Sequence, residues 1–395
     1  MPPIYLDNNA TTFPLPEVRE AVERALRCGG NPSSPHASGR EARALLSEAR
    51  EAVAALLGAS PAEIVFTSGG TEANNLGVIG GARAAAAAGA PRRVVTTAVE
   101  HPAVEEACAR LEQEGFEIIR VGVDGEGMPD PHAFAAAPGA SLVAVMLLQN
   151  ETGAVFPVRE AFAAARARCP SARFHVDAVQ ALGKIPFSPA DLGADTVAVS
   201  AHKIHGPKGS GALWSRPGSE PFPRALGGKQ ERGLRTGTEN VPGAAGFGAA
   251  AVAALRDRAG RSARASLLGA LLEDGLLAIP GARRNGPPRD RRWPATMNVS
   301  FAGVRGDLLL MALDAEEIEV STGSACASGA PVPGRALLAM GLSMDSARGA
   351  VRFSAGALNE EKEIRAAVAA TAAAVSRLRS APPGGGSGDP GHASR

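Results

Sequence analysis

A lysine follows a short apolar run in the segment SAHKIHGPKG, residues 200–209. The apolar run is typical of a buried strand, and the Gly/Pro turn after it indicates that Lys203 lies at the end of that strand. A lysine that loses water at such a place has a lowered pKa and becomes a nucleophilic amine suited to a Schiff base. Lys208 is the competing candidate, but it lies between Pro207 and Gly209 in a turn, where a solvated lysine is the commoner outcome.

A cysteine lies among small residues in the segment STGSACASG, residues 321–329. So few large side chains predict a mobile, exposed loop, and a reactive thiol requires exposure. The alternative is that Cys326 packs as a small hydrophobic residue, as free cysteines commonly do. Cys108, among apolar helix residues, is interpreted as core. Because none of the four cysteines, which include Cys28 and Cys169, shows CxxC or metal-ligand spacing, we expect free thiols and no resident metal.

Two glycines and a threonine open a predicted helix in FTSGGTEANN, residues 66–75. Gly69 and Gly70 let the backbone come close to a ligand, and Thr71 begins a helix whose free N–H groups and dipole favour a phosphate. The same residues are also compatible with an ordinary glycine turn and a threonine cap. The segment is therefore a candidate phosphate site.

Three further polar side chains follow predicted strands. Asp177 ends the apolar run in HVDAVQ, where a carboxylate could pair with a protonated pyridine nitrogen or cap a helix. His101 precedes the helix that Pro102 begins, and it is a candidate for ring stacking and acid–base chemistry, although a lone histidine is more often structural. Asn150, in QNETG, could hydrogen-bond a phenolic oxygen or simply form a turn.

Short apolar strands alternate with helical segments between residues 64 and 215. The strands are IVFTS, VVTTA, FEIIRVGV, SLVAVMLLQN, RFHVDAV, TVAVSAH and GALWS, and the helices between them include residues 71–88, 102–114 and 157–168. This alternation predicts a three-layer α/β domain with a mostly parallel sheet. Open sheets of this kind bind ligands at the carboxyl ends of their strands, where the polar residues above lie.

The rest of the chain predicts a smaller α+β unit. Helical sequence leads to strands and a last helix, at residues 241–277, 297–301, 317–321, 351–354 and 359–379. We expect an N-terminal segment that packs on the small domain, a large domain, a small domain that carries the cysteine loop, and a Gly/Pro/Ser-rich disordered tail. Their boundaries are residues 1–15, 16–258, 259–380 and 381–395.

Charge and hydropathy restrict the partners. The 41 basic and 40 acidic side chains nearly cancel, which leaves no net field to attract nucleic acid or an anionic membrane. The Arg-rich stretch over residues 282–293 is predicted to be a solvated loop rather than a nucleic-acid patch, because it is interrupted by Pro and Gly. The first residues lack a secretory signal, and no run approaches the roughly 20 apolar residues that span a bilayer, so we expect a cytoplasmic protein.

Together these segments resemble the class V aminotransferase-like enzymes of fold type I, and within them the NifS/IscS group of cysteine desulfurases. The resemblance runs from IYLDNNATT at residues 4–12, through NPSSPHASGR at residues 31–40, to VRFSAG at residues 351–356, and six motifs follow the family order. It implies pyridoxal 5'-phosphate as cofactor, L-cysteine as substrate and a homodimer.

The resemblance also assigns roles to residues. Lys203 would bind the cofactor as a Schiff base, Asp177 would pair with its pyridine nitrogen, and His101 would stack on its ring and shuttle a proton. The residues around the phosphate would be Gly70, Thr71, Ser200 and His202. Asn150 and Gln180 would form hydrogen bonds on the side of the cofactor ring that carries its oxygen.

Cys326 matches the family's sulfur-accepting cysteine, and Arg352 matches the arginine that binds the substrate carboxylate. Asn150 would also bind the substrate. The run RTGTEN, residues 235–240, resembles the segment that crosses to the partner subunit, so Thr238 would contact the phosphate bound there. The SGSAC context resembles the long-loop subgroup, which delivers persulfide to acceptor proteins such as an iron–sulfur scaffold. Cys326 could share a transient cluster with that scaffold. The chain departs from the family in lacking the Leu-Glu-Pro often found after ACASG.

The implied reaction converts L-cysteine to L-alanine and leaves a persulfide on Cys326 for iron–sulfur clusters or other sulfur-containing products. A selenocysteine lyase, or another lyase of the same fold, would have an identical cofactor pocket and is the alternative. A scaffold that has lost catalysis is a third hypothesis. The joint presence of five residues argues against it: Lys203, Asp177, His101, Cys326 and Arg352.

Overall fold

The computed structural model of the chain describes residues 3–136, 139–322 and 334–380. Seven strands form its largest sheet, in the order β2-β8-β7-β6-β5-β3-β4. They are β2 (Ile64–Thr67), β3 (Arg93–Thr97), β4 (Glu117–Val121), β5 (Leu142–Met146), β6 (Arg173–Asp177), β7 (Thr196–Ser200) and β8 (Gly211–Ser215). Only β8 runs antiparallel to its neighbours, β2 and β7. The seven predicted strands and the three-layer α/β fold are confirmed.

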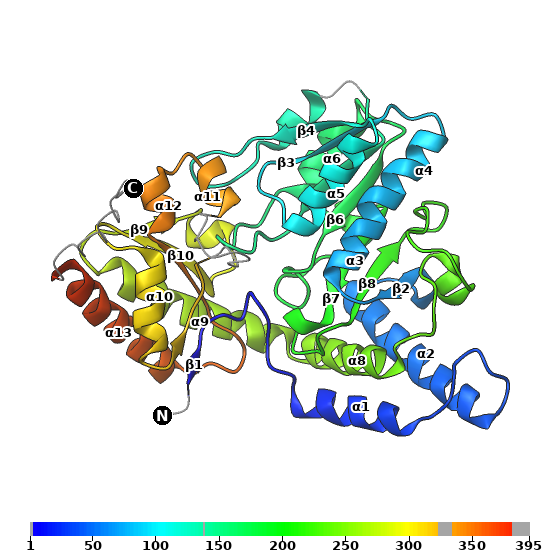
Figure 1. Cartoon of the computed structure of the whole chain (residues 1–395), viewed down its shortest axis with the longest axis horizontal. Helices are drawn as coiled ribbons and strands as arrows, with labels where there is room; N and C mark the ends of the chain where they lie inside the picture. Colours follow the sequence, from blue (N-terminus) through cyan, green and yellow to red (C-terminus); the bar gives the residue numbers. More distant parts are fainter. Residues whose placement is uncertain (1–2, 137–138, 323–333, 381–395) are drawn as a thin grey trace, which may run out of the picture.

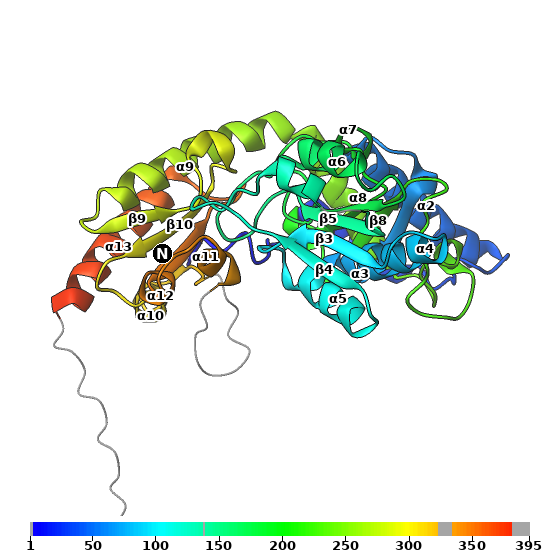
Figure 2. The same cartoon turned by 90° about the horizontal axis from the view of Figure 1, so that it is seen from above.

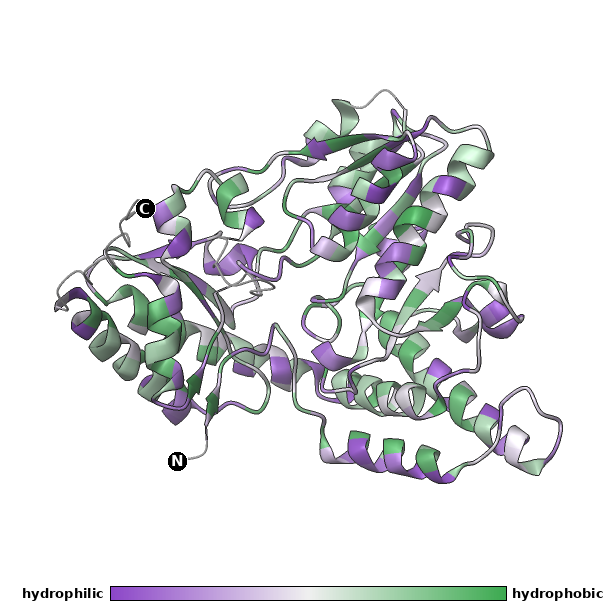
Figure 3. Cartoon of the chain, viewed as in Figure 1, coloured by the Kyte–Doolittle hydropathy of each residue, from purple (hydrophilic) through white to green (hydrophobic). Residues whose placement is uncertain are grey.

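Helices cover both faces of this sheet (Figure 2). One face carries α3 (Gly70–Asn75), α4 (Gly81–Ala87) and α5 (Pro102–Gln113), and the other carries α2 (Ala37–Leu57), α6 (Val158–Arg166), α7 (Pro189–Leu192) and α8 (Val241–Arg256). Successive strand residues point to opposite faces, so Val94 packs with the α5 side while Val95 joins the main core. Helix α1 (Pro16–Arg27) packs on α8 at the outer edge. Figure 3 shows the apolar strands between these helix layers.

The predicted helix over residues 71–88 is divided by a π-helical turn at Leu76–Gly80, which separates α3 from α4. Such turns insert one extra residue per turn and occur frequently at functional sites. Here the turn follows directly after the helix that borders the proposed phosphate site.

The smaller unit lies beyond the long helix α9 (Arg258–Leu277), at the left of Figure 1. Its antiparallel sheet has the order β12-β10-β9. The strands are β9 (Ala282–Asn285), β10 (Thr296–Phe301) and β12 (Ala350–Ser354), and the helices are α10 (Gly306–Asp314), α11 (Arg335–Ala339), α12 (Met344–Arg348) and α13 (Glu361–Ser380). The N-terminal strand β1 (Ile4–Tyr5) pairs in parallel with β11 (Ile318–Glu319). The domain boundaries given above stay a prediction.

The prediction of a solvated loop over residues 282–293 is wrong. Its first residues form β9, and Arg292 is buried, with its Nη2 3.0 Å from a carboxylate oxygen of Glu273. Arg284 and Arg289 also pair with this carboxylate, at 3.0 and 2.7 Å. One buried carboxylate therefore pairs with three arginines, a contact between distant segments that the Pro and Gly content does not reveal.

None of the helices in the described ranges combines the length and apolar character that a membrane span requires.

Candidate active site

The polar residues that follow the strands converge on a cavity of about 280 Å³ at the carboxyl edge of the large sheet. The sheet is mostly parallel, so the segments after β3, β5, β6 and β7 meet at this edge. Eight predicted site residues line the cavity: Gly70, Thr71, His101, Asn150, Asp177, Gln180, His202 and Lys203. A second, adjoining cavity of about 400 Å³ shares three of these residues and adds Ser200.

Lys203 ends a 3₁₀ turn directly after β7. Its Nζ donates to the backbone carbonyl oxygens of Asn9 and Ala10, at 2.5 and 2.8 Å. Burial, reinforced by the charge of Arg352, lowers the pKa of this amine to about 8. Lys208, the competing candidate, is exposed. The geometry therefore gives Lys203 the properties of a nucleophilic amine facing the cavity.

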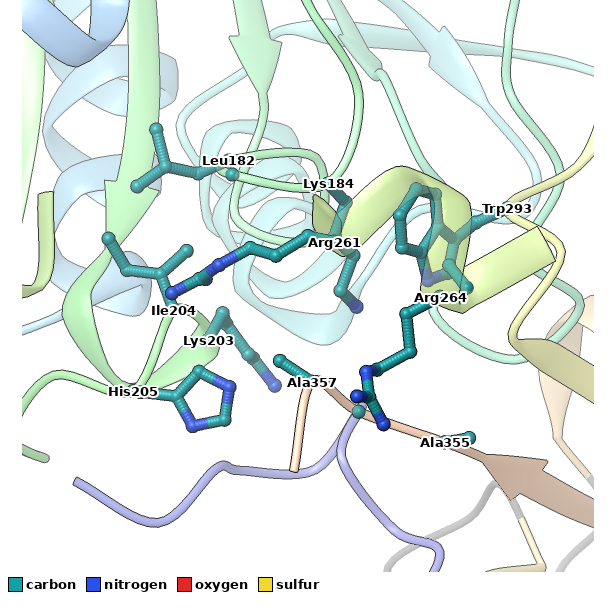
Figure 4. A pocket seen from close by; sticks show the side chains of 13 residues that line it. Leu182, Lys184, Lys203, Ile204, His205, Arg261, Arg264, Trp293, Ala355 and Ala357 are labelled. Atoms are coloured by element: carbon teal, nitrogen blue, oxygen red, sulfur yellow. The ribbon is translucent and has the colours of Figure 1, made fainter. Parts of the chain in front are cut away.

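Lys203 also lines a smaller cavity of about 50 Å³ (Figure 4). Lys184 also reaches toward it, and Arg261 and Arg264 lie at its border. Burial, followed by the charge of Lys203, holds the pKa of Lys184 well below its usual range. The Schiff-base candidate thus has a second buried amine as its neighbour.

Lys184 fixes the amide of Gln180. Its Nζ donates to Oε1 of Gln180 at 2.8 Å and to Oδ1 of Asn9 at 2.7 Å. Nε2 of Gln180 donates in turn to the carbonyl oxygen of Asn9 at 2.7 Å. The NH₂ group of Gln180 carries two N–H donors and only one of them is used here, so the second can meet a ligand in the cavity. Sequence reasoning missed Lys184, because its contact with Asn9 joins segments that lie 175 residues apart.

Asp177 ends β6 with its carboxylate buried. Oδ1 accepts from the backbone N–H of Val179 at 2.9 Å, and Oδ2 accepts from Nδ2 of Asn74 at 2.8 Å. Burial raises the pKa of this carboxyl, while its two hydrogen bonds and the nearby charge of Lys203 act in the opposite direction. A buried carboxylate that lines a cavity is suited to pair with a cation bound there, such as a protonated ring nitrogen.

His101 caps the first turn of α5, because its Nδ1 accepts from the backbone N–H of Ala103 at 3.1 Å. The proton of the neutral ring is therefore on Nε2. Although His101 as a residue is exposed, loss of water around its ring at the cavity lowers its pKa, which favours the neutral form. A neutral imidazole with a fixed tautomer can stack on a planar ligand and exchange a proton through Nε2.

The phosphate end of the site is shaped by small residues. A Cβ added at Gly70 would lie 2.5 Å from Cγ2 of Val179, so a larger residue would displace the wall of the site. The adjoining cavity is also lined by Thr71, Ser200 and His202, whose Nδ1 lies 3.1 Å from Oγ1 of Thr11. Free N–H groups at the start of a helix, together with hydroxyls, are typical phosphate ligands.

Arg352 reaches the site from β12 of the smaller unit. Its Nη2 pairs with Oδ1 of Asp7 at 2.6 Å, and its Nη1 donates to the carbonyl oxygen of Asn150 at 3.1 Å. The guanidinium is buried, and its Nε has no partner among the described residues. Sequence reasoning missed Asp7, which lies within IYLDNNATT at residues 4–12. A carboxylate ligand would compete with Asp7 for this arginine.

Arg352 lies beside the cavity rather than in its lining, and Thr238 is the other described residue of the predicted site that the linings do not include. Thr238 is exposed. Cys326 lies outside the described residues. Among the described cysteines, Cys108 is buried, and burial raises its pKa to about 12, so its thiol is a poor nucleophile.

The sequence matches the profile of the aminotransferase class-V family over residues 4–366. A cysteine desulfurase of Cereibacter sphaeroides is 45% identical over 97% of this chain and 98% of that protein. The cysteine desulfurase IscS of Dictyoglomus turgidum is 40% identical over 96% of each chain. Among solved structures, a NifS-like protein superposes with a TM-score of 0.88 at 36% identity, covering 95% of this chain and all of that one. SspA in complex with cysteine gives a TM-score of 0.77 at 30% identity, covering 89% and 98%.

Proposed function

Because the chain belongs to the class-V aminotransferase family, with cysteine desulfurases as full-length relatives, we propose that it converts L-cysteine to L-alanine and keeps the sulfur as a persulfide on Cys326. It is a pyridoxal-phosphate-dependent enzyme of the cysteine desulfurase type. The observation that carries the proposal is the convergence of Lys203, Asp177 and His101 on one cavity, with Arg352 beside it.

The residues present fit pyridoxal phosphate. Asp177 offers a buried carboxylate to the ring nitrogen, Lys203 offers an amine to the aldehyde, and Gly70 lines the cavity where a larger residue would push against Val179. His101 would lie on the ring, and Gln180 would present its amide donor to the ring oxygen. When bound, the cofactor supplies an electron sink for the charge left as the substrate loses its Cα proton.

Side chains of the protein would carry out the remaining steps, which are substrate orientation, proton transfer and sulfur transfer. Arg352 would exchange Asp7 for the substrate carboxylate, which orients the Cα–H bond toward Lys203. Lys203, with its lowered pKa, would take the Cα proton, and His101 would exchange a proton through Nε2. The Cys326 thiolate would attack the substrate sulfur, so that an S–S bond forms as the C–S bond breaks. The carbon fragment takes up protons and leaves as alanine.

We also infer a homodimer in which Thr238 serves the partner's phosphate site. Two observations support this proposal: residues 237, 238 and 240 of this loop are exposed, and Thr238 has no place in the two cavities of its own subunit that hold the site residues. Arg235 lies 3.5 Å from Glu72, which holds the loop next to the start of α3. The sulfur acceptor would be a protein, such as an iron–sulfur scaffold.

The rate at which pyridoxal phosphate attaches to the apoprotein should rise with pH and level off above about pH 8. Only the unprotonated amine attacks, and the pKa of Lys203 is lowered from its ordinary value to about 8. Roughly a tenth of the amine is therefore free at pH 7, far more than for an ordinary lysine. Stopped-flow absorbance measures the rate, with Nα-acetyl-lysine as control. A rate that keeps rising to pH 10 would contradict the lowered pKa.

Incubation of the holoenzyme with L-cysteine and a thiol reductant tests the proposed function. We expect alanine and sulfide in equal amounts, because the reductant releases the persulfide sulfur after each turnover. L-Selenocysteine in a parallel assay separates this activity from that of a selenocysteine lyase. Turnover of selenocysteine without alanine from L-cysteine would favour the lyase.

A further inference from the structure

A buried chain of hydrogen bonds ends at the Asp177 carboxylate. Oγ1 of Thr196 lies 2.9 Å from Nδ1 of His175, and Nε2 of His175 lies 2.9 Å from Oδ1 of Asn74. Nδ2 of Asn74 then donates to Oδ2 of Asp177 at 2.8 Å. All four residues are buried; Asp177 and Asn74 line the cavity, whereas His175 and Thr196 lie behind it. The chain joins β7, β6 and α3 behind the site.

The direction of each hydrogen bond follows from the ionised carboxylate. A carboxylate accepts only, so Asn74 must turn its NH₂ group toward Asp177 and its Oδ1 toward His175. Nε2 of His175 must then carry the ring proton, and Nδ1 accepts from the hydroxyl of Thr196. Complete burial lowers the pKa of His175 to about 3, so the ring is neutral, as this arrangement requires.

Packing fixes the imidazole in this orientation. Gly77, in the π-helical turn, lies so close that an added Cβ would be 2.3 Å from Nδ1 of His175. The neighbouring Asn75 points elsewhere, because its Nδ2 donates to the carbonyl oxygens of Thr71 and Ala103 at 3.0 and 3.3 Å. The chain therefore offers a matched pair of asparagines on one helix, of which only one reaches Asp177.

We propose that His175 and Asn74 are positioning residues that hold the Asp177 carboxylate ionised and aimed at the ring nitrogen of the cofactor. Burial alone favours the neutral acid, which cannot pair with a protonated pyridine nitrogen. A hydrogen bond from Asn74 opposes that tendency, and His175 prevents the amide from turning its oxygen toward the carboxylate. The inference rests on the proposed function, because it needs a cofactor in the cavity.

The first test compares Asn74→Ala with Asn75→Ala. A hydrogen bond to a charged group is strong enough that its loss should weaken pyridoxal phosphate binding by about 10- to 100-fold. Titration of each apoprotein, followed by cofactor absorbance, gives the dissociation constant, and thermal unfolding checks that the variants are folded. We expect Asn75→Ala to bind within about 2-fold of the wild type. Equal losses in both variants would overturn the proposal.

A double variant tests whether Asn74 acts through Asp177. The Asp177→Asn variant has no carboxylate charge for Asn74 to stabilise. Adding Asn74→Ala to that variant should therefore weaken pyridoxal phosphate binding much less than Asn74→Ala does in the wild type. The same loss in both backgrounds would show that Asn74 acts independently of the carboxylate, and would overturn the proposal. If the wild-type protein bound no pyridoxal phosphate, the proposed function itself would fail, which is a distinguishable outcome.

The protonation state and tautomer of the His175 ring can be measured without any variant of Asn74. In protein labelled with ¹⁵N-histidine, we expect this ring to stay neutral from pH 8 to about pH 5, with its proton on Nε2. A His175→Gln sample assigns the signal by its absence. A ring that titrates near the ordinary histidine pKa, or that carries its proton on Nδ1, would overturn the proposal even if Asn74→Ala did not fold.

Discussion

Replacement of Lys203 by alanine should abolish covalent attachment of pyridoxal phosphate and lower turnover of L-cysteine by about a thousand-fold or more. The loss is expected to be this large because one side chain serves both tasks: it binds the cofactor aldehyde and it moves the Cα proton. Its partly buried position and lowered pKa suit both roles. Borohydride reduction followed by peptide mass spectrometry should find the cofactor on Lys203 of the wild type.

The matched control is Lys208→Ala. Lys208 is exposed and lies five residues further along the same loop, so its removal tests for a general effect of charge near the phosphate end. We expect the cofactor to remain attached and the absorbance band to be unchanged. Cofactor fixed to Lys208 after reduction would show that the lysine is misassigned.

Replacement of Cys326 by alanine should leave the cofactor bound but lower desulfuration by about a hundred-fold or more. The thiol has no expected role in holding the cofactor, so the absorbance band and the dissociation constant should match those of the wild type. The described cysteines are unsuited to replace it, because burial raises the pKa of the Cys108 and Cys169 thiols. Cys28 contacts the carbonyl of Ser38, away from the cavity lining.

Cys28→Ala is the control for this variant, and it should retain full activity. Selenocysteine provides a second comparison, because selenium is the better leaving group and could depart without a thiol acceptor. Full activity of Cys326→Ala on L-cysteine would contradict the sulfur-transfer mechanism, while the assignment of Lys203 would stand.

The site residues that could be predicted from the sequence alone are those marked by a local pattern, namely a polar residue that follows an apolar strand. Lys203, Asp177 and His101 each follow an apolar strand, and a mostly parallel sheet brings such positions to one edge. The strands themselves were readable because fully buried strands are continuous apolar runs. These features need no knowledge of distant contacts.

The parts that sequence missed depend on pairings between distant segments. Asp7 meets Arg352 across 345 residues, and Asn74 meets Asp177 across 103, so neither pair leaves a local signal. His175 looked like an ordinary strand residue, although it shares a face with Asp177 at a spacing of two. The buried arginine cluster around Glu273 was misread for the same reason.

A single turnover with L-cysteine, followed by mass spectrometry of the alkylated protein, tests the central claim most directly. We expect one alanine per active site and one additional sulfur atom on the peptide that contains Cys326. The peptides of Cys28, Cys108 and Cys169 should be unmodified. Alanine without a persulfide on Cys326, or the extra sulfur on another cysteine, would contradict this account of the enzyme.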